Sequence, residues 1–315
     1  MTCQAGQVIT PATRLVDEQT HVLREALTTA LRSIITDLPH LAAKVTTQAT
    51  RLRHTISERV FAAIVVAARG ENPKKALPLC VASALWWISA ESDAPGAQCG
   101  AMLAMRHLQS VRAPDNCKLG WFTEIARSTT SAIETRLAEH GRLISDLNRK
   151  TVLAKNLGFT GAAYARDAAM ATHLTDGEAI DGWRRFGALY GAMRQLHADH
   201  ARSTVDLDGH PRLVVPPLLL AHAFRQGNAG MVQELTRLLR SVPSGDPECH
   251  AVLRDLLRSP RTVSAYSRDL RRLHGKACDV LDGLSSAAEP RAALRAVLDS
   301  TLALPMPGSR ELIGA

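Results

Sequence analysis

Residues 183–222 read WRRFGALYGAMRQLHADHARSTVDLDGHPRLVVPPLLLAH. This pattern predicts a helix that ends near Arg202, then a loop, and then a second helix after the proline pair. Near the end of the first helix, residues four apart share a face, so Ala198 and Arg202 lie together. Asp199 is turned by about 100° from Ala198 and is spaced to pair with Arg202. This face therefore lacks a pair of carboxylates that could share a metal ion.

The rest of the chain also follows the helical period. Leu213–Leu220 is the one β-branched apolar run, and its two prolines argue for a loop that leads into a helix. Elsewhere apolar residues recur at intervals of three and four, and alternating strand-like runs are scarce. The sequence therefore predicts an all-α protein of about ten or more helices. The helical stretches include residues 16–35, 60–68, 162–174 and 253–257.

Prolines and glycines divide these helices without creating a long linker. The chain has 315 residues, of which 46% are hydrophobic, and this is enough for one large core. It shows no repeat of fixed period. We therefore expect residues 1–315 to form a single domain. The predicted breaks include Asn72 with Pro73, Pro95, Pro114, Gly158 and Pro260.

The charge pattern argues against nucleic acid as a partner. The net charge is +8, but the cations form short scattered pairs, and aromatic side chains are not interleaved with them. We interpret them as a solvated basic surface that also suits an anionic substrate. The sequence contains no run of eighteen consecutive apolar residues, so no transmembrane segment is predicted. Because the N-terminus lacks the pattern of a signal segment, the expected location is cytoplasmic. The six cysteines show no paired spacing and are expected to be reduced.

Residues 183–222 resemble the second aspartate-rich helix of the all-trans polyprenyl diphosphate synthases, which belong to the isoprenoid synthases. In that family the consensus is roughly FGxxLGxAFQIxDDxxD, followed by a loop that reads DLxxGKxTLP. The five DDxxD positions read ADHAR here, at residues 198–202, so the motif is degenerate. The residues in step with the family are Phe186, Gly187, Gly191, Gln195 and Leu196 in the helix, and Asp206, Leu207, Gly209 and Pro216 in the loop.

Residues 59–93 resemble the first conserved block of the same family. Where the family continues HDDxxD, this chain reads ESDAP from Glu91 to Pro95. The proline removes the possibility of a second ligand four residues after Glu91 on one helix, so this motif is degenerate as well. The family's lysine–threonine pair, whose lysine binds diphosphate, falls at Phe159 and Thr160. Including residues 266–291, which look like the closing helices, the resemblance covers about residues 50–304.

The resemblance implies a helical bundle around a central cavity and a set of site residues. Bulky aromatic side chains before the first aspartate motif form the floor of the chain-binding tunnel in this family. The implied metal is magnesium, which takes hard oxygen ligands and usually bridges carboxylates to substrate phosphates. The implied metal ligands are Glu91, Asp93 and Asp199. The implied substrate-binding residues are Arg59, Trp86, Trp87, Gln195 and Arg202, and Arg184 and Arg185 are further candidates for contact with phosphate.

The resemblance supports two hypotheses about function. In the first, the protein acts on or binds a prenyl diphosphate, by prenyl transfer or by ionisation as in a class I terpene synthase, with a non-standard metal site. In the second, it is a non-catalytic subunit or prenyl-chain-binding partner that modulates an active synthase. The family commonly dimerises through long apolar helices, so a homodimer or a heterodimer with a related synthase is expected. A third hypothesis, a basic helical module that binds nucleic acid or a membrane surface, would explain only the positive net charge and not the resemblance.

A cluster of histidines and aspartates around the altered motif offers another interpretation. Imidazole together with carboxylate suits transition metals better than magnesium. A replacement metal site is thus conceivable, although such clusters are more often solvated surface groups. The cluster consists of His197, Asp199, His200, Asp206, Asp208 and His210.

Overall fold

The computed structural model describes residues 11–37, 55–90, 94–139, 147–202, 216–241, 247–284 and 288–302. Regular structure in these ranges is helical throughout, without a β-strand, which confirms the predicted all-α class. The elements in chain order are α1 (Pro11–Asp37), η1 (Ile56–Val60), α3 (Phe61–Ala68), η2 (Pro73–Ala76), α4 (Leu77–Ala90), α5 (Ala94–Ser110), α6 (Asp115–Glu139), α7 (Arg149–Asn156), η4 (Leu157–Gly161), α8 (Ala162–Leu174), α9 (Ile180–Arg202), α10 (Pro217–Gln226), α11 (Ala229–Ser241), α12 (Pro247–Leu257), α13 (Pro260–Asp282) and α14 (Ala288–Ser300).

Several helices begin at the prolines that the sequence analysis used as breaks. Pro95 is the second residue of α5, and Pro217 and Pro260 are the first residues of α10 and α13. Proline is tolerated in the first turn because the N–H that it lacks would have no partner inside the helix. The loop-then-helix prediction for Leu213–Leu220 is confirmed from Pro217 onward; residues 213–215 lie outside the described ranges.

The predicted break at Gly158 is wrong. Instead of ending a helix, this glycine lies in η4, a single π-helical turn that joins α7 and α8 into one run from Arg149 to Leu174. A π turn widens the helix by one residue and often occurs at functional sites. Side-chain volume explains the glycine, because a Cβ here would lie 2.2 Å from Oγ1 of Thr135 on α6.

Helices α8 and α9 pack backbone against backbone. A Cβ on Gly187 would lie 2.4 Å from the carbonyl oxygen of Tyr164, and a Cβ on Gly191 would lie 2.7 Å from that of Thr160. From the other side, a Cβ on Gly161 would lie 2.8 Å from the carbonyl oxygen of Ala188. Only glycine permits such approach, so the glycines predicted from the motif fix the spacing and register of these two helices.

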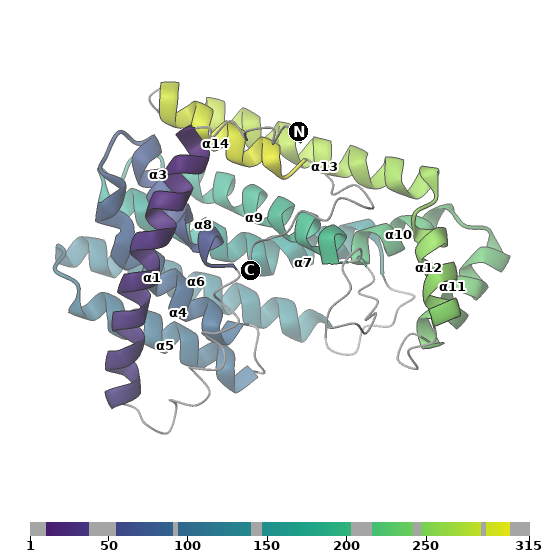
Figure 1. The fold of residues 1–315 in the computed structure, drawn as a ribbon, viewed down its shortest axis with the longest axis horizontal. Helices are drawn as coiled ribbons and strands as arrows, with labels where there is room; N and C mark the ends of the chain where they lie inside the picture. The colour runs from purple at the N-terminus through teal and green to yellow at the C-terminus, as the bar shows by residue number, and fades with distance from the viewer. Residues whose placement is uncertain are drawn as a thin grey trace, which may run out of the picture.

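The buried apolar residues form one connected cluster that extends from α1 to α14. Helix α1 lies across η1, α3 and α4, and also contacts α14 (Figure 1). Helix α13 packs against α9, α10 and α14, while α11 and α12 contact each other and α10 at the far end of the molecule. Helices α4 and α8 thus lie in the interior, where most of their side chains are shielded from water.

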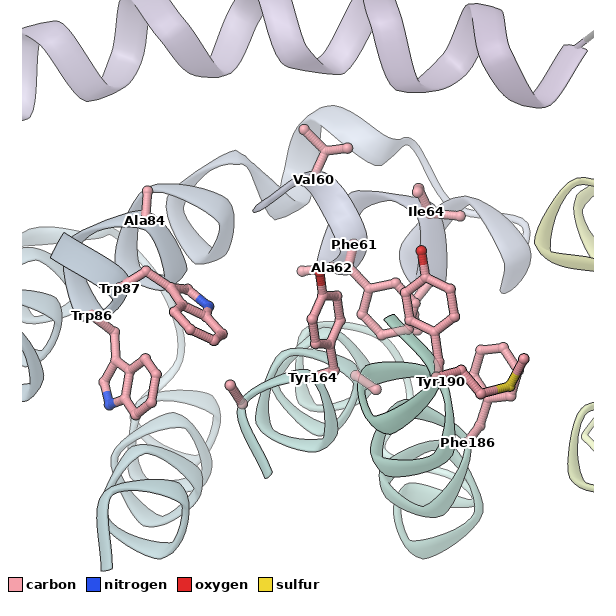
Figure 2. Packing of buried hydrophobic residues seen from close by; sticks show 14 of the residues in the cluster. Val60, Phe61, Ala62, Ile64, Ala84, Trp86, Trp87, Tyr164, Phe186 and Tyr190 are labelled. Carbon is pink, nitrogen blue, oxygen red and sulfur yellow. The ribbon is translucent and has the colours of Figure 1, made fainter. Parts of the chain in front are cut away.

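Aromatic rings join α3 to α8 and α9 in this core. The ring of Phe61 stacks on Tyr190 with centroids 4.8 Å apart and meets the edge of Tyr164 at 5.1 Å. Figure 2 shows these rings between the two lower helices and α3, with Phe186 beside them and with Trp86 and Trp87 on the other side. Offset and edge-to-face pairs of this kind stabilise a core beyond the effect of their buried area.

Candidate functional site

A series of hydrogen bonds joins the π turn to the C-terminal part of α9. Thr160 donates its hydroxyl to the Gln195 side-chain oxygen at 2.7 Å, and the Gln195 amide nitrogen donates to Oδ1 of Asp199, also at 2.7 Å. Thr160 and Asp199 are both buried. Gln195 and Asp199 are four residues apart and therefore share one face of α9. This series orients the carboxylate of Asp199, the one acidic residue left in the DDxxD positions.

Helix α13 supports the same end of α9. The Tyr266 hydroxyl donates to the carbonyl oxygen of Leu196 at 2.6 Å, and the Tyr266 ring stacks on His200 with centroids 5.6 Å apart. Burial, together with the negative charge of Asp199, raises the pKa of the Tyr266 hydroxyl. Burial is also the main cause of the lowered pKa of His200, which favours its neutral form at neutral pH.

The last turn of α4 carries two tryptophans that face the π turn. Trp86 and Trp87 are 3% and 7% exposed, and their rings meet edge to face with centroids 5.2 Å apart. Both rings also contact Phe159, at centroid distances of 6.3 and 6.0 Å. The indole nitrogen of Trp86 donates to the hydroxyl of Thr129 on α6 at 3.1 Å. These three rings form a continuous aromatic wall between α4 and η4.

Guanidinium groups lie over each ring of this wall. Arg59 lies 4.1 Å above the Trp87 ring, Arg166 lies 4.6 Å above the Trp86 ring, and Arg136 lies 5.2 Å above the Phe159 ring. Such contacts place positive charge against the negative face of an aromatic ring. The predicted site residue Arg59 is only 4% exposed, and it contacts Glu58 at 3.3 Å. Arg59 therefore lies behind the aromatic wall.

A buried charge cluster supports Trp86 from α8. Arg166 donates from Nε and Nη2 to Oδ1 of Asp167, at 2.8 and 2.6 Å, and Ser83 donates to Oδ2 at 2.7 Å. Arg166 and Asp167 are 1% and 2% exposed. The sequence analysis missed this cluster, because an Arg–Asp pair inside an alanine-rich helix looks like a solvated pair. The sequence feature that could have revealed it is that residues 162–174 are largely apolar around the whole helix, which predicts a buried helix.

The structure gathers some predicted site residues and separates others. Arg184 and Arg185 lie near the start of α9, about 21 Å along its axis from Asp199 at 1.5 Å per residue, so they do not share a site with that carboxylate. Arg202 ends α9, and its side chain lies outside the described residues, as do Glu91, Asp93, Asp206, Asp208 and His210. Trp86, Trp87, Gln195 and Asp199 remain as the described core of the candidate site.

The described residues fit a magnesium ion only in part. Asp199 offers one hard carboxylate, whereas magnesium needs near-octahedral oxygen coordination. Within the described ranges, no three His, Cys, Asp or Glu side chains are grouped so that they could hold a metal ion. The replacement transition-metal site around His197 and His200 therefore has no support from these residues, and its partners in the following loop lie outside them.

None of the helices in the described part of the chain is long and apolar enough to span a membrane.

Comparison with solved structures identifies the architecture. A polyprenyl synthetase from Streptomyces coelicolor A3(2) superposes with a TM-score of 0.74 at 15% identity, covering 92% of this chain and 99% of that one. A geranylgeranyl pyrophosphate synthetase from Pyrococcus horikoshii Ot3 gives 0.70 at 15% identity, covering 91% and 98%. The geranylgeranyl pyrophosphate synthase of Corynebacterium glutamicum, complexed with isoprenyl diphosphate and magnesium, gives 0.68 at 17% identity, covering 92% and 99%.

Comparison by sequence, unlike comparison by structure, finds no related protein. No family model matches the chain, and no curated protein matches it either. The resemblance read from residues 59–93 and 183–222 is nevertheless consistent with the neighbours found by structure. The chain therefore has the fold of the polyprenyl diphosphate synthases.

Proposed function

We propose that this protein acts on or binds a prenyl diphosphate near the C-terminal ends of α4 and α9. The observation that carries the proposal is the series from Thr160 through Gln195 to Asp199. It joins the two segments that resemble the lysine–threonine turn and the second aspartate-rich helix of the synthases. A chain that kept only the fold would have no need to orient this one remaining carboxylate. The proposal takes residues 1–315 as one domain, in keeping with the connected core.

The aromatic wall suits the prenyl tail. Trp86, Trp87 and Phe159 are large apolar side chains in mutual contact, and the two tryptophans lie at the end of α4, where the resemblance implies the tunnel floor. Because both indoles are packed in place by stacked guanidinium groups, they leave little depth behind them. We therefore propose a ligand with a short prenyl chain.

The charged head of the ligand needs a different arrangement from the family's. Phe159 stands where the resemblance places a diphosphate-binding lysine, and Ala198 and Arg202 replace two carboxylates of the DDxxD motif. We propose that Gln195 and Arg202 contact the diphosphate, with Glu91, Asp93 and Asp199 as the ligands of magnesium. Bound magnesium would neutralise charge on the departing diphosphate. Asp199 is held ready for this by the amide of Gln195.

A non-catalytic subunit of an active synthase is the second candidate. The loss of acidic residues at the two family motifs favours it, because ordinary magnesium binding needs several carboxylates. Large apolar side chains on the outer helices favour it as well. Met102 on α5, and Leu119 and Leu137 on α6, are each about two-thirds exposed. Such residues suit a dimer contact, either between two copies or with a related synthase.

Incubation of the full-length protein with allylic diphosphates separates the two candidates. Dimethylallyl, geranyl, farnesyl and geranylgeranyl diphosphates would be supplied with and without isopentenyl diphosphate and magnesium. Each reaction would be run with the protein alone and with a competent synthase added. Product from the protein alone supports prenyl-diphosphate chemistry. A changed product length only in the mixture supports the subunit. If no allylic diphosphate binds and the mixture behaves as the synthase alone, both candidates are wrong.

A further inference from the structure

A pocket lies between α6, α8 and the first half of α9, and one residue of its lining, Arg166, also stacks on Trp86 of the candidate site. Its cavity is about 350 Å³ and is lined by four arginines from these three helices. Arg185, which belongs to this lining, lies about 21 Å along α9 from Asp199. The four are Arg127, Arg166, Arg184 and Arg185. The proposed function assigns no ligand contact to these four side chains.

The arginines outnumber the carboxylates that neutralise them. Glu124 is 3% exposed and accepts from both Arg184 at 2.7 Å and Arg127 at 3.2 Å. Asp181 forms a second ion pair with Arg184. Arg185 is exposed and has no ion pair with any residue that the structure describes. Asp167 pairs with Arg166, so the four guanidinium groups face three carboxylates, and the surplus of one positive charge lies with Arg185.

One wall of the pocket holds a buried donor without an acceptor. Arg166 is 1% exposed and presents the edge formed by Nε and Nη2 to Asp167. Its Nη1 lies on the opposite side of the guanidinium, and among the described residues it has no hydrogen-bond partner. A buried N–H of a charged group without an acceptor costs free energy, and buried polar groups in proteins are nearly always paired. Nη1 is buried from the cavity as well as from solvent, so an anionic oxygen in the pocket would satisfy this donor once the Arg166 side chain shifts towards it.

The remaining lining is small and apolar. Ala162, Ala165 and Ala188 face the cavity beside the stems of the arginines, and Ser128 and Ser131 add hydroxyls. A cavity of this size with an apolar wall and a few convergent donors is typical of a small-molecule site. We propose that the pocket binds a small organic anion with a short apolar body and a carboxylate or phosphate head. The head pairs with Arg166 and Arg185, and the body lies against the alanines.

Arg166 connects this pocket to the candidate site. Its guanidinium lies over the ring of Trp86 while the same residue lines the pocket. An anion bound at Nη1 changes the charge and position of the group that stacks on the indole. Ligand binding should therefore change the intrinsic tryptophan fluorescence of the protein.

Calorimetric titration of the full-length protein tests the proposal. Hexyl phosphate and hexanoate serve as probes of the two head groups, and hexanol and hexylammonium serve as uncharged and cationic controls of the same length. Arg185→Ala removes an exposed cation of the pocket, and Arg268→Ala removes an exposed cation of α13 as a matched control. Ala188→Leu fills the apolar side, and Gln195→Leu alters the candidate site.

We expect at least one of the two anions, hexyl phosphate or hexanoate, to bind. Their dissociation constants then show which head group the pocket prefers. Arg185→Ala should weaken binding about tenfold, because one charge-assisted hydrogen bond is lost. Ala188→Leu should weaken it further, whereas Arg268→Ala and Gln195→Leu should leave it unchanged. The proposal is wrong if neither anion binds, if hexanol binds as tightly as the anions, or if Arg185→Ala behaves like Arg268→Ala. Loss of binding in Gln195→Leu alone would assign the probe to the candidate site instead.

Discussion

Replacing Gly187 by alanine tests whether close packing of α8 and α9 builds the candidate site. The added Cβ would lie 2.4 Å from the carbonyl oxygen of Tyr164, 2.8 Å from its carbonyl carbon and 3.0 Å from Cα of Ala165. All three atoms belong to the backbone of α8, so no side chain can rotate away. The two helices must move apart, and the contact between Thr160 and Gln195, two turns along α9, is strained with them.

The size of the effect follows from two opposing contributions. Overpacking a closely packed interior costs about 1–3 kcal/mol, and a clash with backbone belongs at the upper end of that range. Alanine in place of glycine within a helix contributes about 1 kcal/mol of stability in the other direction. The net loss is about 2 kcal/mol. For 315 residues the entropy of unfolding is about 0.66 kcal/mol/K, so Tm should fall by about 3 °C.

Gly275→Ala is the matched control for this substitution. Gly275 also lies within a long helix, α13, but a Cβ there would meet no atom within 4 Å. Only the helix-propensity contribution remains, so this variant should gain about 1 kcal/mol. Urea unfolding followed by circular dichroism, together with calorimetry, measures both variants. If Gly187→Ala is as stable as Gly275→Ala, the close approach of α8 and α9 is not what requires glycine.

Three further predictions concern the site and its surroundings. Thr160→Val removes the donor to Gln195 and should weaken prenyl diphosphate binding about tenfold by calorimetry. The control Thr123→Val, whose hydroxyl donates to the Leu119 carbonyl in its own helix, should bind normally. Trp86→Ala should lower stability by about 3–5 kcal/mol and shift the preferred allylic diphosphate to a longer chain in competition binding; an unchanged preference would remove Trp86 from the floor of the site. Burial lowers the pKa of four histidines, so the unfolded state takes up more protons than the folded state as the pH falls below about 6.5. The free energy of unfolding should therefore decrease from pH 7 to pH 5. Replacing His222 with glutamine should make that decrease smaller. The four are His107, His173, His200 and His222.

Local sequence predicted the helices well where periodicity and punctuation agreed. The stretch 162–174 corresponds to α8, and prolines 95, 217 and 260 lie in first turns of helices. Gly158 was misread because glycine has two uses that look alike in one dimension. It can end a helix, or it can let another helix approach, and here the nearby Thr135 requires the second.

The candidate site was partly predictable for the same reason. The order Gly187, Gly191, Gln195 places three residues four apart, and therefore on one face of a helix. That face meets α8 at Gly187 and the π turn at Gly191, which brings Gln195 to Thr160. The separation of Arg185 from Asp199 also follows from the sequence, because 14 residues of one straight helix span about 21 Å.

The sequence by itself determined that the chain is helical, where most helices begin, and which glycines and polar residues share a face, because these properties depend on contacts between near neighbours. The tertiary structure alone decided that Arg166 and Asp167 are buried, that Arg59, Arg136 and Arg166 lie over aromatic rings, and that four arginines from three helices surround one pocket. The physical reason is that burial and charge pairing depend on which helices pack together, and the partners here, such as Ser83 and Asp167, are separated by many residues in the chain.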